Sequence, residues 1–98
     1  MNMQAMLKQA QKLQKDMIET QKKINETIFT GTSSAVTAKL NGKKEIVDLK
    51  IDLEKLDPED IELLQDMIVV AINSAIKQID KETEEKLGAY TQGMPGLF

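Results

Sequence analysis

The 98-residue chain contains no cysteine and no histidine, and only three of its residues are aromatic. Without cysteine, the sequence can form neither a disulfide framework nor a thiolate zinc site. Without histidine, it can form neither a catalytic triad nor an imidazole metal site. We therefore expect no cofactor and no bound metal. We also expect no enzyme, because no set of nucleophile, base and metal can be assembled.

The sequence also lacks a long apolar run. Its longest, Met67–Ile72, is far shorter than the roughly 20 residues that span a bilayer. The N-terminus has no apolar stretch of the kind that forms a secretory signal, so we expect a cytoplasmic protein. A chain this short forms one domain with a modest core, and association with a second copy would be a natural way to complete that core.

Charge is distributed unevenly along the chain. Residues 1–50 contain nine lysines and five acidic residues, whereas residues 51–98 contain four lysines and eleven acidic residues. The net charge of −3 therefore hides a basic first half and an acidic second half. The first half could face a polyanion, and the second half could not.

Residues 3–25 predict a long helix, because they contain no glycine or proline and few β-branched residues. Their apolar positions alternate in spacings of three and four, which is the pattern of a short heptad seam. Two interpretations stay open: an amphipathic helix that lies on a sheet, or a seam that packs wholly or partly against a second chain. The seam consists of Met3, Met6, Ala10, Leu13, Met17, Thr20 and Ile24.

Residues 27–53 change to a period of two and are rich in threonine, isoleucine and valine, which predicts three strands. Asn41-Gly42 lies between the second and third runs. This pair is the strongest short hairpin signal, because both residue types tolerate a positive φ. A two-residue turn there would pair Val36 with Val47 and place the apolar residues of both strands on one face.

A second helix is predicted over residues 58–87. Asp57 would cap its N-terminus and Pro58 would occupy its first helical position. Two neighbouring apolar stripes run along this helix, so we expect it to pack on the sheet and also on a partner. The remaining residues, 88–98, are punctuated by glycine and proline and are expected to form a flexible tail. The first stripe is Ile61, Leu64, Ile68, Ile72, Ala75 and Ile79, and the second is Leu63, Met67 and Val70.

The predicted order is therefore α-β-β-β-α in a single domain, residues 1–98. This is an α+β fold in which two long helices flank a three-stranded antiparallel sheet. With these elements in place, the sequence resembles the YbaB/EbfC family of bacterial nucleoid-associated proteins over nearly the whole chain. The resemblance rests on the order and spacing of MQAMLKQAQKLQKDM, Thr30-Gly31, Asn41-Gly42, VDLKID, DPEDIELLQDMIVVAINSAIKQI and the terminal GMPGLF.

The resemblance implies a tweezer-like homodimer, in which the sheets and second helices form a central body and the other helices project as arms. It further implies a protein of the cytoplasm and nucleoid that binds duplex DNA with little sequence preference and influences nucleoid organisation and gene expression. One segment departs from the family pattern. Many members carry a glycine-rich turn between the first two strands, where this sequence has the shorter GTSSA.

Lysines are the candidate DNA-binding residues. On the heptad of the first helix, Lys8, Lys15 and Lys22 share the outermost position, about 10.5 Å apart at a rise of 1.5 Å per residue. Such a line could follow phosphates, with each contact adding affinity through counterion release. It could equally be a solvated outer face. The full candidate set is Lys8, Lys12, Lys15, Lys22, Lys23, Lys39, Lys43 and Lys44.

The lysines near the hairpin have an alternative role, since edge lysines protect a sheet against aggregation. The sequence also contains no arginine. The bidentate pairing of a guanidinium with guanine is therefore impossible, and any DNA binding should be led by the phosphate backbone.

Apolar residues on the two helices are the candidate dimer interface, with a second copy of the chain as the expected partner. An alternative function is a protein-interaction module that uses the helical seam and the acidic second half and does not bind DNA. We expect neither a membrane nor a small-molecule substrate as a partner. The interface candidates are Met6, Leu13, Met17, Leu63, Met67 and Val70.

Overall fold

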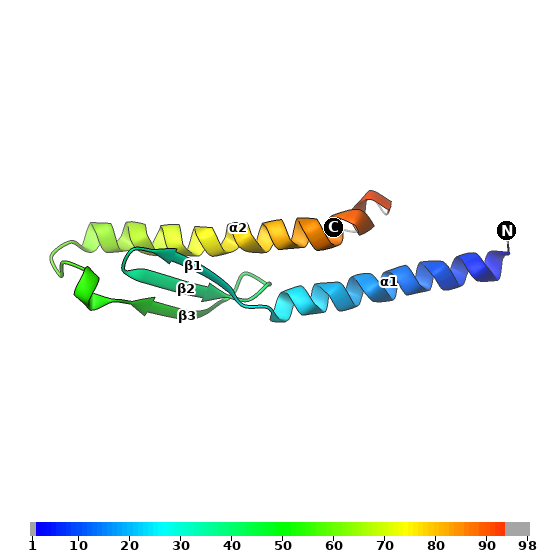
Figure 1. Cartoon of the computed structure of the whole chain (residues 1–98), viewed down its shortest axis with the longest axis horizontal. Helices are drawn as coiled ribbons and strands as arrows, with labels where there is room; N and C mark the ends of the chain where they lie inside the picture. The colour runs from blue at the N-terminus through cyan, green and yellow to red at the C-terminus, as the bar shows by residue number, and fades with distance from the viewer. Residues whose placement is uncertain (1, 94–98) are drawn as a thin grey trace.

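The computed structural model describes residues 2–93. Two long helices and a three-stranded antiparallel sheet form an elongated molecule of 70 × 19 × 14 Å, and the predicted α+β fold and element order are confirmed (Figure 1). The elements are α1 (Met3–Glu26), β1 (Phe29–Ser33), β2 (Val36–Leu40), β3 (Ile46–Ile51), a short 3-10 turn η1 (Leu53–Lys55) and α2 (Ile61–Gly93).

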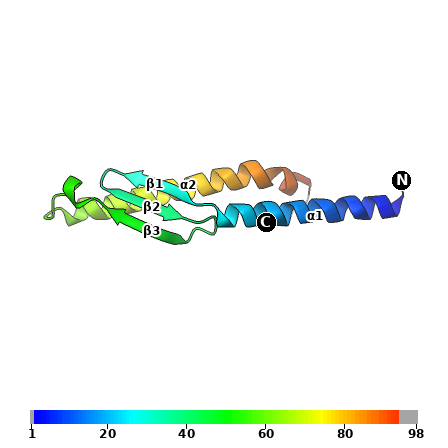
Figure 2. The same ribbon diagram turned by 60° about the horizontal axis from the view of Figure 1, so that its bottom comes forward.

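The sheet has the strand order β1-β2-β3, and α2 lies across β1 and β2 on one face (Figures 1 and 2). Alternate residues of β2 point toward α2 and are fully buried: Val36, Ala38 and Leu40. Helix and sheet approach closely at Gly31 in β1. A Cβ atom at Gly31 would overlap the carbonyl of Ala71 and lie 2.7 Å from the backbone nitrogen of Ala75. The absence of a side chain at Gly31 therefore sets the packing distance between the two layers.

The connection between β2 and β3 differs from the prediction. It spans residues 41–45, and Val36 pairs with Ile51 rather than Val47, with a bulge between Lys39 and Leu40. The predicted two-residue turn is therefore wrong, and neither Asn41 nor Gly42 has a φ in the left-handed region.

Side-chain hydrogen bonds explain the longer loop. The Asn41 Oδ1 accepts from the backbone N–H groups of Lys43 (2.9 Å) and Glu45 (3.1 Å). The loop closes with Lys44 at a φ of 65°. Asn41 thus stabilises the loop through its side chain, as asparagine does in Asx turns, and not through its own backbone conformation.

α2 begins and ends later than predicted. Asp60 caps its N-terminus, because Asp60 Oδ1 accepts from the backbone N–H of Leu63 at 3.1 Å. Asp57 instead accepts from the N–H of Glu59 in the preceding turn, so its prediction as the helix cap is wrong. At the other end the helix continues past Leu87 to Gly93. Residues 88–93 are therefore helical rather than part of a flexible tail, and the rest of the predicted tail, residues 94–98, lies outside the described part of the chain.

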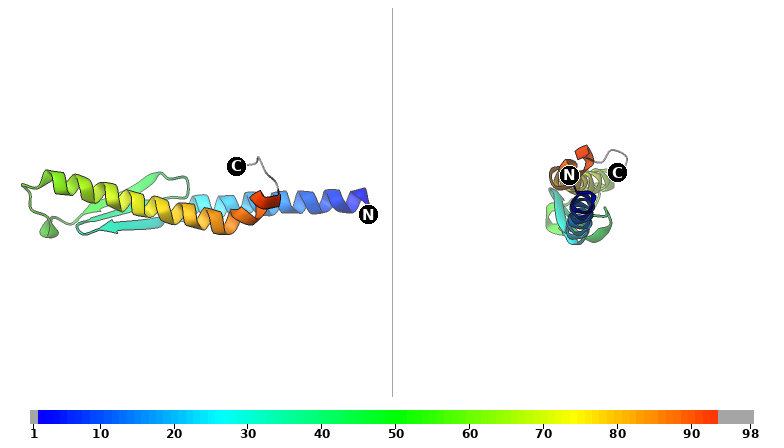
Figure 3. Two further views of the ribbon diagram at one scale, coloured as in Figure 1. Left: turned by 90° about the horizontal axis from the view of Figure 1, so that it is seen from above. Right: turned by 90° about the vertical axis from the view of Figure 1, so that its right-hand side faces the viewer.

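α1 does not lie on the sheet, so that interpretation of its apolar seam is wrong. Within the described residues it contacts α2, through its second half, and no strand. Ile24 is buried there and Met17 packs against the core. The first half of α1 extends beyond the end of α2, as Figure 3 shows. Residues 2–15 are all exposed, and α1 residues 3–15 are called the arm below.

Candidate nucleic-acid interface

α1 presents five of the predicted lysines to solvent. Lys8, Lys15 and Lys22 are exposed, and none of them forms an ion pair with any residue between 2 and 93. Their seven-residue spacing places them about 10.5 Å apart along the helix. Lys12 and Lys23 are also exposed and lack an ion pair with a described residue. The helix therefore carries a line of exposed lysines that have no ion-pair partner among the described residues.

The arm has the strongest positive charge relative to its length. It contains three lysines and no acidic residue, and the first acidic residue of the chain, Asp16, follows it. Thirteen helical residues extend about 20 Å. Because the Debye length is about 8 Å at physiological salt, the acidic residues of the distant body are largely screened from the end of the arm. The net negative charge of the chain therefore does not govern the field at the arm.

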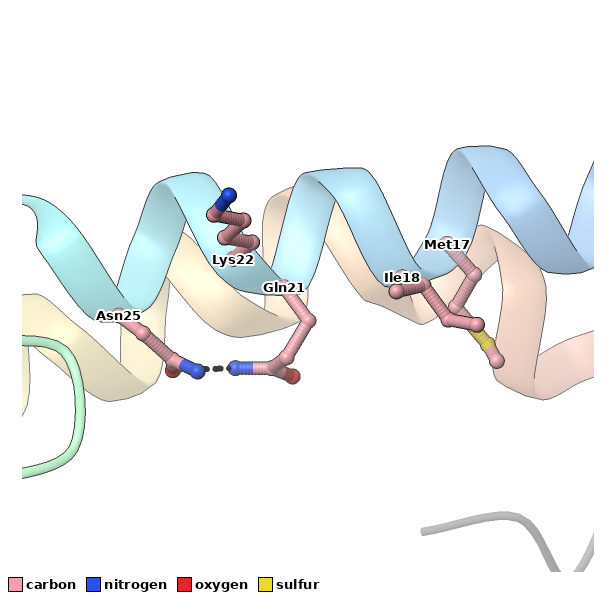
Figure 4. A pocket seen from close by; sticks show the side chains of 5 residues that line it. All are labelled: Met17, Ile18, Gln21, Lys22 and Asn25. Atoms are coloured by element: carbon pink, nitrogen blue, oxygen red, sulfur yellow. Dashed lines mark hydrogen bonds between the residues drawn. The ribbon is translucent and has the colours of Figure 1, made fainter.

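The other side of α1 is apolar, and α2 covers only part of it. Figure 4 shows a shallow groove on this side, lined by Met17, Ile18, Gln21, Lys22 and Asn25. Gln21 Nε2 donates to Asn25 Oδ1 at 2.8 Å, while the Lys22 side chain turns away from both. Lys22 lines the groove and also belongs to the lysine line, so the apolar flank of the helix and its lysine line adjoin at this residue.

The loop between β2 and β3 is attached to the C-terminal end of α1. The backbone N–H of Gly42 donates to the carbonyl of Asn25 at 3.2 Å. A Cβ atom at Gly42 would overlap the carbonyl of Ile24, so only glycine allows this approach. The contact brings Lys43 and Lys44 near the last turns of α1. The negative end of the helix dipole lies there and favours nearby cations.

The loop lysines differ in their partners. Lys44 Nζ lies 2.9 Å from Asp80 Oδ1 on α2, so its charge is partly compensated. Lys43 is exposed and has no ion pair with a described residue. Lys39 lies apart from both, on the sheet face that points away from α2 and directly opposite Asp48. The structure thus brings the loop lysines near α1 but leaves Lys39 on the sheet.

Lys86, near the C-terminal end of α2, differs from the lysines of α1 because it has an ion-pair partner. Lys86 Nζ is 2.7 Å from Glu82 Oε1, one helical turn away. The hydrogen bond and charge of the Glu82 carboxylate, with a further contribution from Glu85, raise the pKa of the Lys86 ammonium. Lys86 is therefore engaged within its own helix, unlike the lysines of α1.

The candidate dimer-interface residues fall into two groups. Met67 is buried in the core of the chain and Met17 is half-buried against it, so both offer little surface to a second copy. The other four, which are exposed apolar side chains, are Met6, Leu13, Leu63 and Val70.

The structure adds an apolar surface that the sequence did not indicate. α2 does not contact β3 within the described residues. The apolar residues of β3 therefore stay exposed: Ile46 52%, Val47 51%, Leu49 39% and Ile51 37%. Leu49 and Ile51 lie directly opposite the fully buried Ala38 and Val36, so they share the face that α2 covers elsewhere. The sequence could have indicated this exposure, because a single helix about 10 Å wide is too narrow to cover all three strands of a sheet.

The described residues offer surface charge and little other chemistry. No group of three or more histidine, cysteine, aspartate or glutamate side chains within residues 2–93 is placed to hold a metal ion. Neither α1 nor α2, as far as they are described, combines the length and apolarity that a bilayer crossing requires. Exposed lysine side chains act as point charges, which suits contact with phosphates rather than bases.

Comparisons with known proteins are consistent with a basic surface that contacts DNA. The profile of the YbaB/EbfC DNA-binding family matches residues 1–94. A nucleoid-associated protein of Enterococcus faecalis is 48% identical over 98 residues, covering 98% of this chain and 94% of that protein. A nucleoid-associated protein of Lactococcus lactis subsp. cremoris is 50% identical over 97 residues, covering 97% and 98%.

A solved structure has the same fold. The crystal structure of an uncharacterized protein from Helicobacter pylori matches with a TM-score of 0.69 and 28% identity, covering 94% of this chain and 97% of that chain. The family profile extends from the arm to the end of α2, so it includes every element described above. The chain therefore belongs to the YbaB/EbfC DNA-binding family.

Proposed function

We propose that this protein is a nucleoid-associated protein that binds the backbone of duplex DNA through the lysines of α1. The observation that carries the proposal is the line of Lys8, Lys15 and Lys22, exposed and without an ion pair among residues 2–93. The names of the relatives, which are nucleoid-associated proteins of Enterococcus and Lactococcus, support a role in the bacterial nucleoid and cytoplasm. The proposed role is binding rather than catalysis.

Binding of this kind has little sequence preference. Lysine ammonium groups contact phosphates as point charges, and the chain has no arginine for a bidentate contact with guanine. Each phosphate that a lysine neutralises releases counterions, so affinity falls steeply as salt rises. Lys12, Lys23 and Lys43 extend the same basic surface. Lys44 and Lys39 contribute less, because Asp80 and Asp48 lie close to them.

The proposed working form is a homodimer. The inner face of β3 is an exposed apolar edge, and such an edge in a stable soluble protein is normally covered. A second copy could cover it with its own β3 and with the apolar residues on the outer side of α2. Of the predicted interface residues, Leu63 and Val70 are exposed and available for this contact. Two copies would also present two arms, as in the tweezer arrangement.

The lysine proposal is tested by the triple variant Lys8→Gln, Lys15→Gln and Lys22→Gln. Glutamine keeps helix propensity and most of the side-chain length while it removes the charge. We expect unchanged far-UV circular dichroism, weaker duplex binding at low salt, and a shallower slope of log K against log salt.

A matched control removes three charges of the opposite sign from the C-terminal half of α2: Glu82→Gln, Glu84→Gln and Glu85→Gln. This variant should bind equally well or slightly more tightly. If the lysine variant keeps the parent's affinity and slope, the line is only a solvated face. The protein would then be better explained as a protein-interaction module that uses the exposed apolar half of α1.

The dimer proposal is tested by Leu49→Lys, which places a charge on the uncovered edge without filling the core. Light scattering should report twice the chain mass of 11.0 kDa for the parent and a monomer for the variant. Thr32→Lys adds the same charge to the polar face of the sheet and should remain dimeric. A monomeric parent at micromolar concentration would rule out the homodimer.

A further inference from the structure

We propose that the hollow at the end of the sheet farthest from α1 binds a phosphate of the nucleic-acid backbone through Lys50 and Lys55. Neither lysine belongs to the set that the sequence suggested. The inference rests on the proposed DNA-binding function and adds a second contact region to it. The hollow is lined by Ser34, Ala35, Thr37, Lys50, Ile51, Asp52 and Lys55.

Backbone hydrogen bonds bring these segments together. The N–H of Asp52 donates to the carbonyl of Ala35 at 2.7 Å, which joins the β1–β2 turn to the end of β3. The N–H of Lys55 donates to the carbonyl of Asp52 at 3.1 Å, so η1 turns the chain back toward the strand that it has just left. Lys50 and Lys55 therefore line one hollow although they belong to different elements.

The charges favour an anion. Lys50 and Lys55 are exposed, and neither forms an ion pair within the described part of the chain. The acidic residue that lines the hollow is Asp52, and its Oδ1 accepts from the backbone N–H of Glu54 at 3.1 Å. That hydrogen bond holds the carboxylate at the start of η1 and satisfies part of its charge locally. The lining thus has two ammonium groups against one carboxylate, and its net positive charge favours an anionic ligand.

Two hydroxyl groups complete the donor set. Thr37 lies directly opposite Lys50 in the sheet, so both side chains point away from α2. Ser34 has a φ of 47°, a conformation that glycine or asparagine adopts more readily. A serine at this position supplies a hydroxyl to the lining of the hollow. Neither hydroxyl is hydrogen-bonded to any residue from 2 to 93. Serine and threonine hydroxyls are regular phosphate donors in protein–DNA complexes.

The location makes this contact independent of α1. The strands run along the long axis of the molecule between α1 and the hollow (Figure 1). A five-residue strand extends about 17 Å, which is well beyond the Debye length at physiological salt. A phosphate held in the hollow would therefore differ from those at the arm, and its counterion release would add to theirs.

The test compares two double variants for binding to a mixed-sequence DNA duplex at several salt concentrations. Lys50→Gln with Lys55→Gln removes the proposed site. Lys77→Gln with Lys81→Gln removes the same charge from exposed positions on α2, where neither lysine has an ion pair with a described residue. We expect the first pair to weaken binding about tenfold at 50 mM salt and to reduce the salt slope by about one, as loss of one phosphate contact predicts. The second pair should change affinity less than threefold.

A third variant removes a hydroxyl without a change in charge. Ser34→Gly relieves the positive φ, so it should fold at least as well as the parent, and it should bind DNA two- to fivefold more weakly. Equal losses in the two lysine pairs would overturn the inference, as would parent-level binding by Lys50→Gln with Lys55→Gln. If that variant binds fully while the α1 triple variant does not, only the hollow fails. If the parent binds no DNA, both proposals fail.

Discussion

Substitution of Gly42 by alanine is expected to destabilise the protein strongly, although Gly42 lies in an exposed loop and has an unremarkable φ. The added Cβ atom would overlap the carbonyl of Ile24 and lie 2.8 Å from the Cα atom of Asn25. Both are backbone atoms at the end of α1, so no side chain can move aside. The loop must separate from the helix, and the hydrogen bond from the Gly42 N–H to the Asn25 carbonyl is lost.

The magnitude follows from these two effects. Overpacking against backbone costs about 1–3 kcal/mol, and loss of one backbone hydrogen bond costs about 0.5–1.5 kcal/mol. The expected loss in the free energy of unfolding is therefore about 1.5–4.5 kcal/mol. At about 4–8 °C per kcal/mol for a domain of this size, a central value of about 3 kcal/mol corresponds to a decrease in Tm of about 12–24 °C.

The assay is thermal unfolding followed by circular dichroism at one fixed protein concentration, because self-association would make Tm concentration-dependent. Gly42→Asn separates two explanations. Asparagine tolerates a positive φ, so it would rescue stability if the residue served only as a turn. The close approach predicts that asparagine destabilises as much as alanine. A Gly42→Ala variant within about 0.5 kcal/mol of the parent, or rescue by asparagine, would refute the packing explanation.

Two further predictions concern stability. Gly31→Ala should lower the free energy of unfolding measured in urea by about 1–3 kcal/mol, because its Cβ atom would overlap the Ala71 carbonyl. An unchanged free energy of unfolding would mean that helix and sheet separate easily. Asp60→Ala should cost about 1 kcal/mol by chemical denaturation, since the Leu63 N–H loses its capping acceptor. Asp57→Ala should cost less, because it caps only the preceding turn, and the reverse order would contradict the assignment of the cap.

Local patterns predicted the elements well because each depends on nearby residues. The spacing of apolar residues identified both helices, and the alternation around Val36 and Leu49 identified strands. The register between β2 and β3 was not predictable in the same way. It depends on how the Asn41 side chain holds its own loop and on the contact between Gly42 and α1, which joins segments far apart in the sequence.

The functional surface was only partly predictable for the same reason. The helical period placed Lys8, Lys15 and Lys22 on one side of α1. The hollow with Lys50 and Lys55 forms where the β1–β2 turn, the end of β3 and η1 come together in space. The spacing of residues in the sequence does not predict this proximity. The exposure of β3 likewise depends on where α2 crosses the sheet, which its amphipathic pattern does not specify.

The most direct test of the central claim is the affinity of the parent protein for a mixed-sequence DNA duplex, measured between 50 and 200 mM salt. If the three lysines of the line on α1 each neutralise one phosphate, log K should fall with log salt by about 0.9 per phosphate. The slope should therefore be about −2.7 or steeper. The affinity should also change little between duplexes of different sequence. Absence of binding at 50 mM salt, or binding with a slope near zero, would contradict the account.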